Sequence, residues 1–279
     1  MKIAVKMLIC AAVVVFCGTL AQATQVLTNA GYLENFNEMG TTGGTCPDGY
    51  SLGAVPGGNT TFGVSGATTN AGPITAAGAA SASGWTTSVV EWDMTQGQVK
   101  SSTNAYNCGV NPASADRALG EDPTGDAANA LQLILMNGTG APLSSVTFAY
   151  DEKCFSLGTC QYGATEPDEG NDLPGYAFFY STTGSTLASD WSADANLHTT
   201  SYTVGGVEHA TDTITFASPV APGGSMYFRW LDDNGYWVSP DQMFAIDNVT
   251  VAVAPTPEPA TLTVLVLGGL AILRRKHAA

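Results

Sequence analysis

The sequence predicts an all-β fold, an antiparallel two-sheet sandwich of the jelly-roll type, on three observations. Short runs alternate apolar and polar residues with period two, as half-buried strands do. Turn-forming pairs such as Asn137-Gly138, Pro222-Gly223 and Asn234-Gly235 separate these runs. No segment of the body keeps a 3.6-residue period over three turns, which argues against a helical domain.

The alternating runs begin at Leu131, and we expect strands at 131–136, 146–150, 176–180, 212–216 and 226–230. In the last of these, Met226 and Phe228 share a face with Trp230, which places Trp230 in the core. The apolar parity then switches between Ile246 and Val249. This switch predicts a β-bulge around Asp247-Asn248.

Residues 40–90 are rich in Gly, Thr, Ala and Ser and hold few large apolar side chains before Trp85. This composition predicts long loops and thin edge strands around the sandwich. The body contains no clear internal repeat and no second-domain boundary. We therefore expect one β-sandwich ectodomain over residues 24–254.

The N-terminus has the three parts of a secretory signal peptide. Lys2 and Lys6 are basic, residues 7–16 are apolar, and Ala21-Gln22-Ala23 forms a small-residue cleavage site. We expect residues 1–23 to be removed after Ala23. A buried N-terminal helix is the alternative interpretation.

Residues 255–279 contain Pro257-Glu258-Pro259, a short apolar run over 262–273, and a basic cluster that begins with Arg274 and Arg275. A helix of twelve residues extends only about 18 Å, against about 30 Å of hydrocarbon. The basic residues would hold the extreme C-terminus on the cytoplasmic side. The segment is thus a marginal inner-membrane anchor.

The order of these elements resembles the PEP-CTERM sorting signal of bacterial exosortase substrates, and Gly268-Gly269 also fits it. The resemblance implies that an exosortase recognises Pro257, Glu258 and Pro259 and cuts nearby. It further implies a transient membrane tether, followed by release to the cell surface or extracellular matrix. A plain anchor without processing remains open.

Short motifs across the body look like landmarks of the lectin-like β-sandwich ectodomains that often precede such tails. They are Asn35-Phe36-Asn37, Met39-Gly40-Thr41, 116–120, Phe228-Arg229-Trp230 with Asp232, and 245–249. The resemblance implies an extracellular sandwich without an assigned reaction. It therefore supports the fold more than any activity.

The expected ectodomain is a polyanion, because it holds four basic residues against 23 acidic ones, a net charge of −19. Nucleic acid is excluded as a partner, since its binding depends on Lys and Arg that neutralise phosphates. An acidic surface supplies hard oxygen ligands for divalent cations. We expect acidic solvated loops without a bound metal and therefore no cofactor; calcium is the one candidate, with Asp232, Asp233 and Asn234 as its tentative ligands.

Four cysteines stay in the ectodomain, and an even number in an exported chain predicts disulfides. The short separation of Cys154 and Cys160 favours a local loop bridge, which assigns Cys46 and Cys108 to the second. A zinc site is the alternative, but no C-x-x-C pair exists. The only histidines of the body, His198 and His209, are expected on the surface.

We expect no catalytic residues, because the chain has no G-x-S-x-G elbow. Glycoside hydrolysis remains an alternative, since two carboxylates about 5–10 Å apart suffice and Glu91 and Asp93 flank Trp92 on one strand. Tyr236 and Trp237 lie beside an acidic turn, where exposed rings could stack on sugars. The sequence therefore predicts a non-catalytic surface or matrix protein that binds polysaccharide; the alternatives are a structural or adhesive protein without ligand and a glycan-active enzyme.

Overall fold

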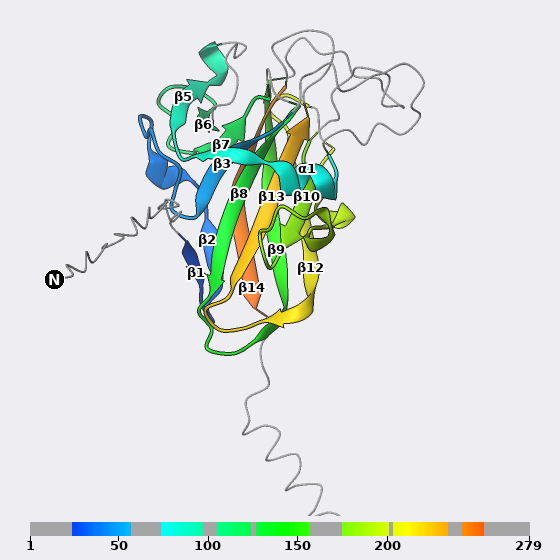
Figure 1. The fold of residues 1–279 in the computed structure, drawn as a ribbon. Helices are drawn as coiled ribbons and strands as arrows, with labels where there is room; N and C mark the ends of the chain where they lie inside the picture. Colours follow the sequence, from blue (N-terminus) through cyan, green and yellow to red (C-terminus); the bar gives the residue numbers. More distant parts are fainter. Residues whose placement is uncertain are drawn as a thin grey trace, which may run out of the picture.

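We describe the fold from a computed structural model, over residues 24–56, 74–96, 105–123, 127–156, 175–200, 203–233 and 242–253 (Figure 1). The segments predicted as signal peptide and sorting signal lie outside these ranges, as do Cys160, Asn234, Tyr236 and Trp237. Among the described residues, no helix is long and apolar enough to cross a bilayer.

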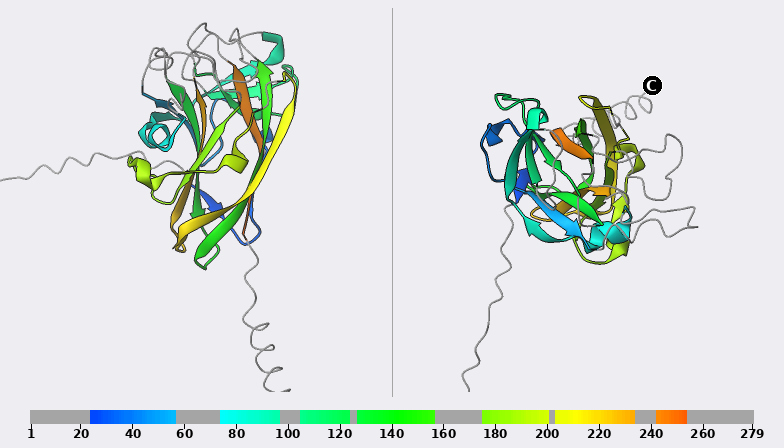
Figure 2. Two further views of the ribbon diagram at one scale, coloured as in Figure 1. Left: turned by 90° about the vertical axis from the view of Figure 1, so that its right-hand side faces the viewer. Right: turned by 90° about the horizontal axis from the view of Figure 1, so that it is seen from above.

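The described residues form two sheets of seven strands each, so the predicted all-β sandwich is confirmed (Figures 1 and 2). The first sheet has the order β11 (Ser192–Ala193), β10 (Ala177–Ser181), β13 (Ser225–Asp233), β8 (Ala128–Asn137), β3 (Tyr50–Val55) and β4 (Ser83–Thr86), with β1 (Gln25–Leu27) on β8. The second has the order β12 (Val207–Val220), β9 (Leu143–Ser156), β14 (Met243–Val253), β7 (Ala118–Glu121), β6 (Ala105–Gly109) and β5 (Val89–Asp93), with β2 (Tyr32–Glu34) on β14.

Two strand pairs are parallel, β1 with β8 and β5 with β6, where the sequence predicted an antiparallel sandwich. Alternation reports which face a side chain occupies and carries no information on strand direction. Short helical turns connect the strands, at η1 (Asn37–Met39), η3 (Met94–Gln96), η4 (Ala188–Asp190) and η5 (Ala195–Leu197).

The core between the sheets is built on aromatic rings. The Phe148 ring lies 4.7 Å from Phe228, 5.0 Å from Phe178 and 5.8 Å from Trp230 between centroids. Trp230 is fully buried, as its alternation with Met226 and Phe228 predicts. Ring contacts of this kind join the two sheets and fix their spacing.

The outer face of the first sheet is also covered, because α1 (Ala76–Ser81) lies across it (Figure 1). Arg229 on this face lies between Trp85 and Trp191, with its guanidinium 4.5 Å and 4.0 Å from the ring centroids. Its Nε donates to Gln132 at 2.8 Å, and its Nη1 donates to the backbone of α1. The sheet is therefore buried on both faces.

The prediction of loops and thin edge strands over residues 40–90 is partly wrong. β3 lies inside the first sheet, between β8 and β4, and its Tyr50 and Leu52 are fully buried. Only Tyr50 and Leu52 are large on its core face, where Ala54 follows them, and on the opposite face Gly53 leaves room for the Trp85 ring, 2.8 Å from where a Cβ would stand. A short strand with a glycine gives a weak period-two signal.

The predicted bulge at Asp247-Asn248 is confirmed by a register shift between Asp247 and Thr250 in the pairing of β14 with β9. Asn248 has φ of 49°, a left-handed conformation that asparagine tolerates better than most residues. Its Nδ2 donates to Asp151 at 2.8 Å, while the buried Asp247 pairs with Lys153 at 2.7 Å.

The predicted Cys46–Cys108 bridge is not formed, since both residues have free, buried thiols. The Cys46 amide donates to Thr87 just before β5, whereas Cys108 lies opposite Trp92 at the far end of that strand. Five residues of strand separate these points by about 16 Å, while bridged Cα atoms lie within about 7 Å. The Cys154–Cys160 bridge remains a prediction, since Cys160 lies outside the described residues.

Candidate functional site

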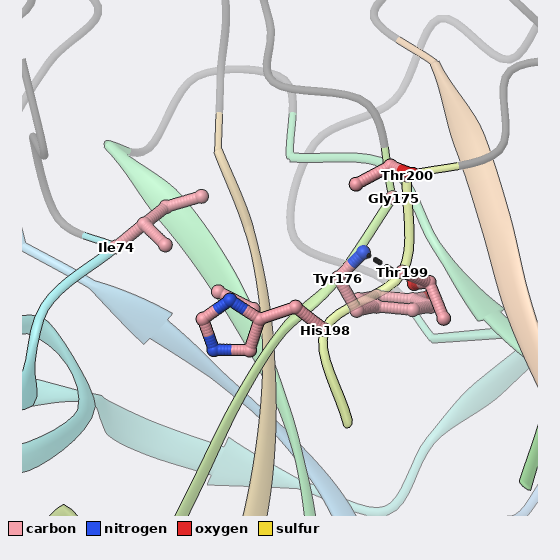
Figure 3. A pocket seen from close by; sticks show the side chains of 7 residues that line it. Ile74, Gly175, Tyr176, His198, Thr199 and Thr200 are labelled. Carbon is pink, nitrogen blue, oxygen red and sulfur yellow. Dashed lines mark hydrogen bonds between the residues drawn. The ribbon is translucent and has the colours of Figure 1, made fainter. Parts of the chain in front are cut away.

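An open pocket of about 160 Å³ lies at the edge of the first sheet, beside β10 (Figure 3). One side is Ile74, directly before the N-cap residue of α1, and the other side is the segment His198–Thr200. Gly175, Tyr176 and Ala177 at the start of β10 complete the lining. None of these seven residues is acidic, so the pocket lacks the carboxylate pair of a glycosidase.

Hydrogen bonds to Tyr176 hold the segment His198–Thr200, the pocket wall, in place. The Thr199 amide donates to the Tyr176 carbonyl at 3.0 Å, and the Tyr176 amide donates to the Thr199 hydroxyl at 2.9 Å (Figure 3). Gly175 has φ of 76°, and a Cβ there would stand 2.4 Å from the Thr199 carbonyl oxygen. Only glycine permits so close an approach of the two segments.

Behind this wall lies Glu152 of β9, which is fully buried and accepts a hydrogen bond from the Thr199 hydroxyl. Burial, together with the charge of Glu208 directly across on β12, raises the pKa of Glu152 to about 9. The side chain is therefore a neutral acid near pH 7. It supports the pocket wall and does not line the pocket.

His198 is the main polar group of the pocket and is only partly exposed, so the prediction of an exposed surface histidine holds only in part for it. Burial lowers the pKa of the His198 imidazole, which keeps the ring neutral at pH 7 with one donor and one acceptor nitrogen. The Phe179 ring lies 6.2 Å away. His209, in contrast, is exposed and pairs with Asp151 at 2.8 Å.

The pocket thus combines apolar surface from Ile74 and Ala177 with a neutral imidazole and the side chains of two threonines. Small-molecule sites are built in this way, with mainly apolar walls and a few polar groups that orient the ligand. Sequence reasoning missed this site, because its two sides come from segments far apart in the chain. The one signal available was His198 itself.

The structure describes two of the three predicted calcium residues. Asp232 and Asp233 are buried at the end of β13 and do not form an exposed turn, while Asn234 lies outside the described residues. Among the residues described, no three Asp, Glu, His or Cys side chains are grouped so that they could hold a metal ion. The calcium prediction stays untested at this turn.

Glu91 and Asp93 do lie on one face of β5, where Gln96 bridges them. Its Nε2 donates to Glu91 at 3.3 Å and to Asp93 at 3.0 Å. Thr95 also donates to Asp93, through its amide at 2.8 Å and its hydroxyl. The two carboxylates therefore have a structural role, because these hydrogen bonds fix η3 to the end of β5.

No protein-family model and no curated protein matches the chain. Similar solved structures include TmCBM61 in complex with β-1,4-galactotriose, with 10% identity, a TM-score of 0.28, and 50% of this chain and 72% of that one covered. A carbohydrate-binding module specific for non-crystalline cellulose, CBM28, has 14% identity, a TM-score of 0.28, and coverage of 56% and 84%. The K3 cleaved adhesin domain of Lys-gingipain from Porphyromonas gingivalis w83 has 12% identity, a TM-score of 0.26, and coverage of 49% and 71%. Such TM-scores identify no family and carry no functional conclusion.

Proposed function

We propose that this chain is an exported cell-surface or extracellular-matrix protein whose sandwich binds polysaccharide without catalysing a reaction. The pocket beside β10 carries the proposal. It offers apolar surface to the C–H face of a sugar ring, together with the His198 imidazole and the exposed Thr200 hydroxyl for the sugar hydroxyls. Its lining residues carry no charge at pH 7, which suits a neutral glycan.

The overall charge supports the same class of ligand. An ectodomain of net charge −19 repels anionic polymers, so uronate-rich or sulfated glycans are disfavoured. The outer face of the first sheet does not compete as a site, because α1 and the Arg229 stack cover it. A ligand would therefore bind at the edge, where the pocket opens.

Export and sorting form the second part of the proposal and rest on the sequence. The signal peptide over residues 1–23 would deliver the body outside, and exosortase would recognise Pro257-Glu258-Pro259. The triple change Pro257→Ala, Glu258→Ala and Pro259→Ala should then leave the chain unprocessed at the inner membrane. Unchanged processing in a host with exosortase would refute the sorting proposal.

Affinity electrophoresis in gels that contain soluble neutral polysaccharides tests the binding proposal. We expect retardation of the wild type, and a dissociation constant raised about fivefold to tenfold by His198→Ala, the cost of one or two hydrogen bonds. His209→Ala is the matched control, since this exposed histidine lies on the other sheet, and it should bind as the wild type does. Equal retardation of His198→Ala and wild type would reject this pocket, and no retardation on any glycan would favour the structural or adhesive alternative.

A further inference from the structure

Polar side chains gather at one end of the space between the two sheets. Leu131 of β8, Trp230 of β13 and Leu119 of β7 all point into the core. Asn129, Asp232 and Glu121 lie two residues along the same strands and so share their faces. Asn129 and Asp232 are cross-strand partners in the first sheet, while Glu121 comes from the second.

Tyr176 joins this group from the start of β10. Its ring lies 6.0 Å from Phe244, the cross-strand partner of Glu121. Burial raises the pKa of the Tyr176 phenol well above its ordinary value, and the charges of Glu121 and Asp232 raise it further. Since directly opposed residues of an antiparallel pair share a face of the sheet, the Tyr176 ring lies on the same side of the second sheet as Glu121.

Glu121 is fully buried, and neither of its carboxylate oxygens has a hydrogen-bond partner. The three ion pairs found among the described residues involve other acids. A buried carboxylate without partners is strongly unfavourable unless a proton or a cation neutralises it. Asp122, the next residue, is also buried and adds a second like charge.

Two neutral polar groups, the Asn129 amide and the Tyr176 hydroxyl, indicate that a metal ion and not a proton neutralises Glu121. The Asn129 Nδ2 donates to the Asp122 carbonyl at 3.0 Å, which leaves the buried Asn129 Oδ1 without a partner. The buried Tyr176 hydroxyl has no partner either. A proton on Glu121 would satisfy at most one of these acceptors, whereas a metal ion binds several oxygens at once.

All the candidate ligand atoms are oxygens. Glu121 supplies a carboxylate from the second sheet, and the first sheet supplies the Asp232 carboxylate, the Asn129 amide oxygen and the Tyr176 phenol. Such hard ligands select calcium or magnesium over zinc, and calcium accepts amide oxygens and waters in irregular geometry. Three grouped acids are therefore not required. We propose that Glu121, Asp232 and Asn129 bind a calcium ion between the sheets, with Tyr176 beside it.

This site differs from the turn that the sequence predicted, because it takes Asp232 without its neighbours. Asp233 shares the parity of Leu231 and Arg229, which face outward, so it points away from the ion. The Gln242 amide approaches Asp232 Oδ1 at 3.5 Å and orients that carboxylate. A bound ion would join the two sheets at the end of β7, β8 and β13.

Calcium titration of the chelator-treated full chain tests the proposal. At a hundredfold excess over Kd, we expect Tm to rise by about 5–10 °C. Glu121→Gln should abolish the rise, and its calcium-free Tm should stay close to that of the calcium-free wild type, because burial raises the pKa of Glu121 well above its ordinary value and the amide then replaces a neutral acid of the same shape. Glu152→Gln is the matched control, a buried acid held by Thr199, and it should keep the rise.

Terbium provides a measurement that does not depend on stability. Bound Tb³⁺ should emit on excitation at 280 nm through energy transfer from Tyr176, and calcium should displace it. Tyr176→Phe should reduce this emission and keep the calcium-induced rise in Tm. No rise in Tm and no emission in the wild type, or a rise that Glu121→Gln leaves unchanged, would overturn the proposal.

Discussion

Replacement of Glu152 by Gln should remove one steep component of the pH dependence of stability. Glu152 has a folded pKa of about 9, against an ordinary value of 4.5. Between these values the folded state holds a proton that the unfolded state has released, so the free energy of unfolding falls as pH rises. The stabilising contribution is complete below pH 4.5 and is lost as pH rises through about 9.

The size of the effect follows from one proton, about 1.4 kcal/mol for each pH unit. Between pH 5 and pH 8 the wild type should therefore lose about 4 kcal/mol relative to Glu152→Gln. The amide keeps an oxygen for the Thr199 hydroxyl and never ionises. Urea unfolding at pH 5, 6, 7 and 8, followed by tryptophan fluorescence, measures the difference.

Glu208→Gln is the informative second variant, because Glu208 lies across from Glu152 and its charge raises the pKa of Glu152. In this variant the same slope should end at a lower pH. Parallel curves of unfolding free energy against pH for the wild type and Glu152→Gln would refute the reasoning. Such a result would mean that Glu152 ionises alike in the folded and unfolded states.

Three further predictions concern the rest of the fold. Arg229→Met should lower the free energy of unfolding, measured in urea, by about 3 kcal/mol, because it removes the stack on Trp85 and Trp191 and the buried hydrogen bonds. Arg229→Lys should recover only part of this loss, since lysine lacks the planar guanidinium. Asn248→Val should cost at least 1 kcal/mol more than Asn248→Gly in the same assay, because φ of 49° strains a β-branched residue. Burial raises the pKa of the Cys46 thiol to about 12, so iodoacetamide should modify Cys46 only in the denatured protein. Peptide mass spectrometry measures this modification. A disulfide at Cys46 under non-reducing conditions would contradict the structure.

The strands that sequence alone predicted are those with large apolar residues at alternate positions. Trp230 and the bulge at Asp247-Asn248 follow from parity, which is a local property of the chain. β3 was missed because Gly53 and Ala54 cut short its alternation, and α1 because it consists only of Ala, Gly and Ser. Tyr50 and Leu52 of β3 are buried in the core between the sheets, whereas α1 is buried on the outer face beside Arg229, and no local pattern reveals either contact.

The candidate sites were harder to predict for a related reason. The pocket needs Ile74 and His198 side by side, and the proposed calcium site combines Glu121 of the second sheet with Asp232 of the first. The acidic turn singled out in the sequence contains Asp232, but the sequence could not show that Asp232 and Asp233 end β13 with both side chains buried. The cysteine pairing failed in the same way, since sequence separation is a poor guide to distance in a sandwich.

The pocket wall and the buried acid behind it set opposite limits on the pH range for binding. Below the lowered pKa of His198, the ring gains a proton and loses its acceptor nitrogen. Toward pH 9, Glu152 gains a charge beside Glu208, and the wall segment that donates to it through Thr199 becomes costly to keep in place. Binding through this pocket is therefore strongest between these two pKa values, and Glu152→Gln should extend the range only on the alkaline side.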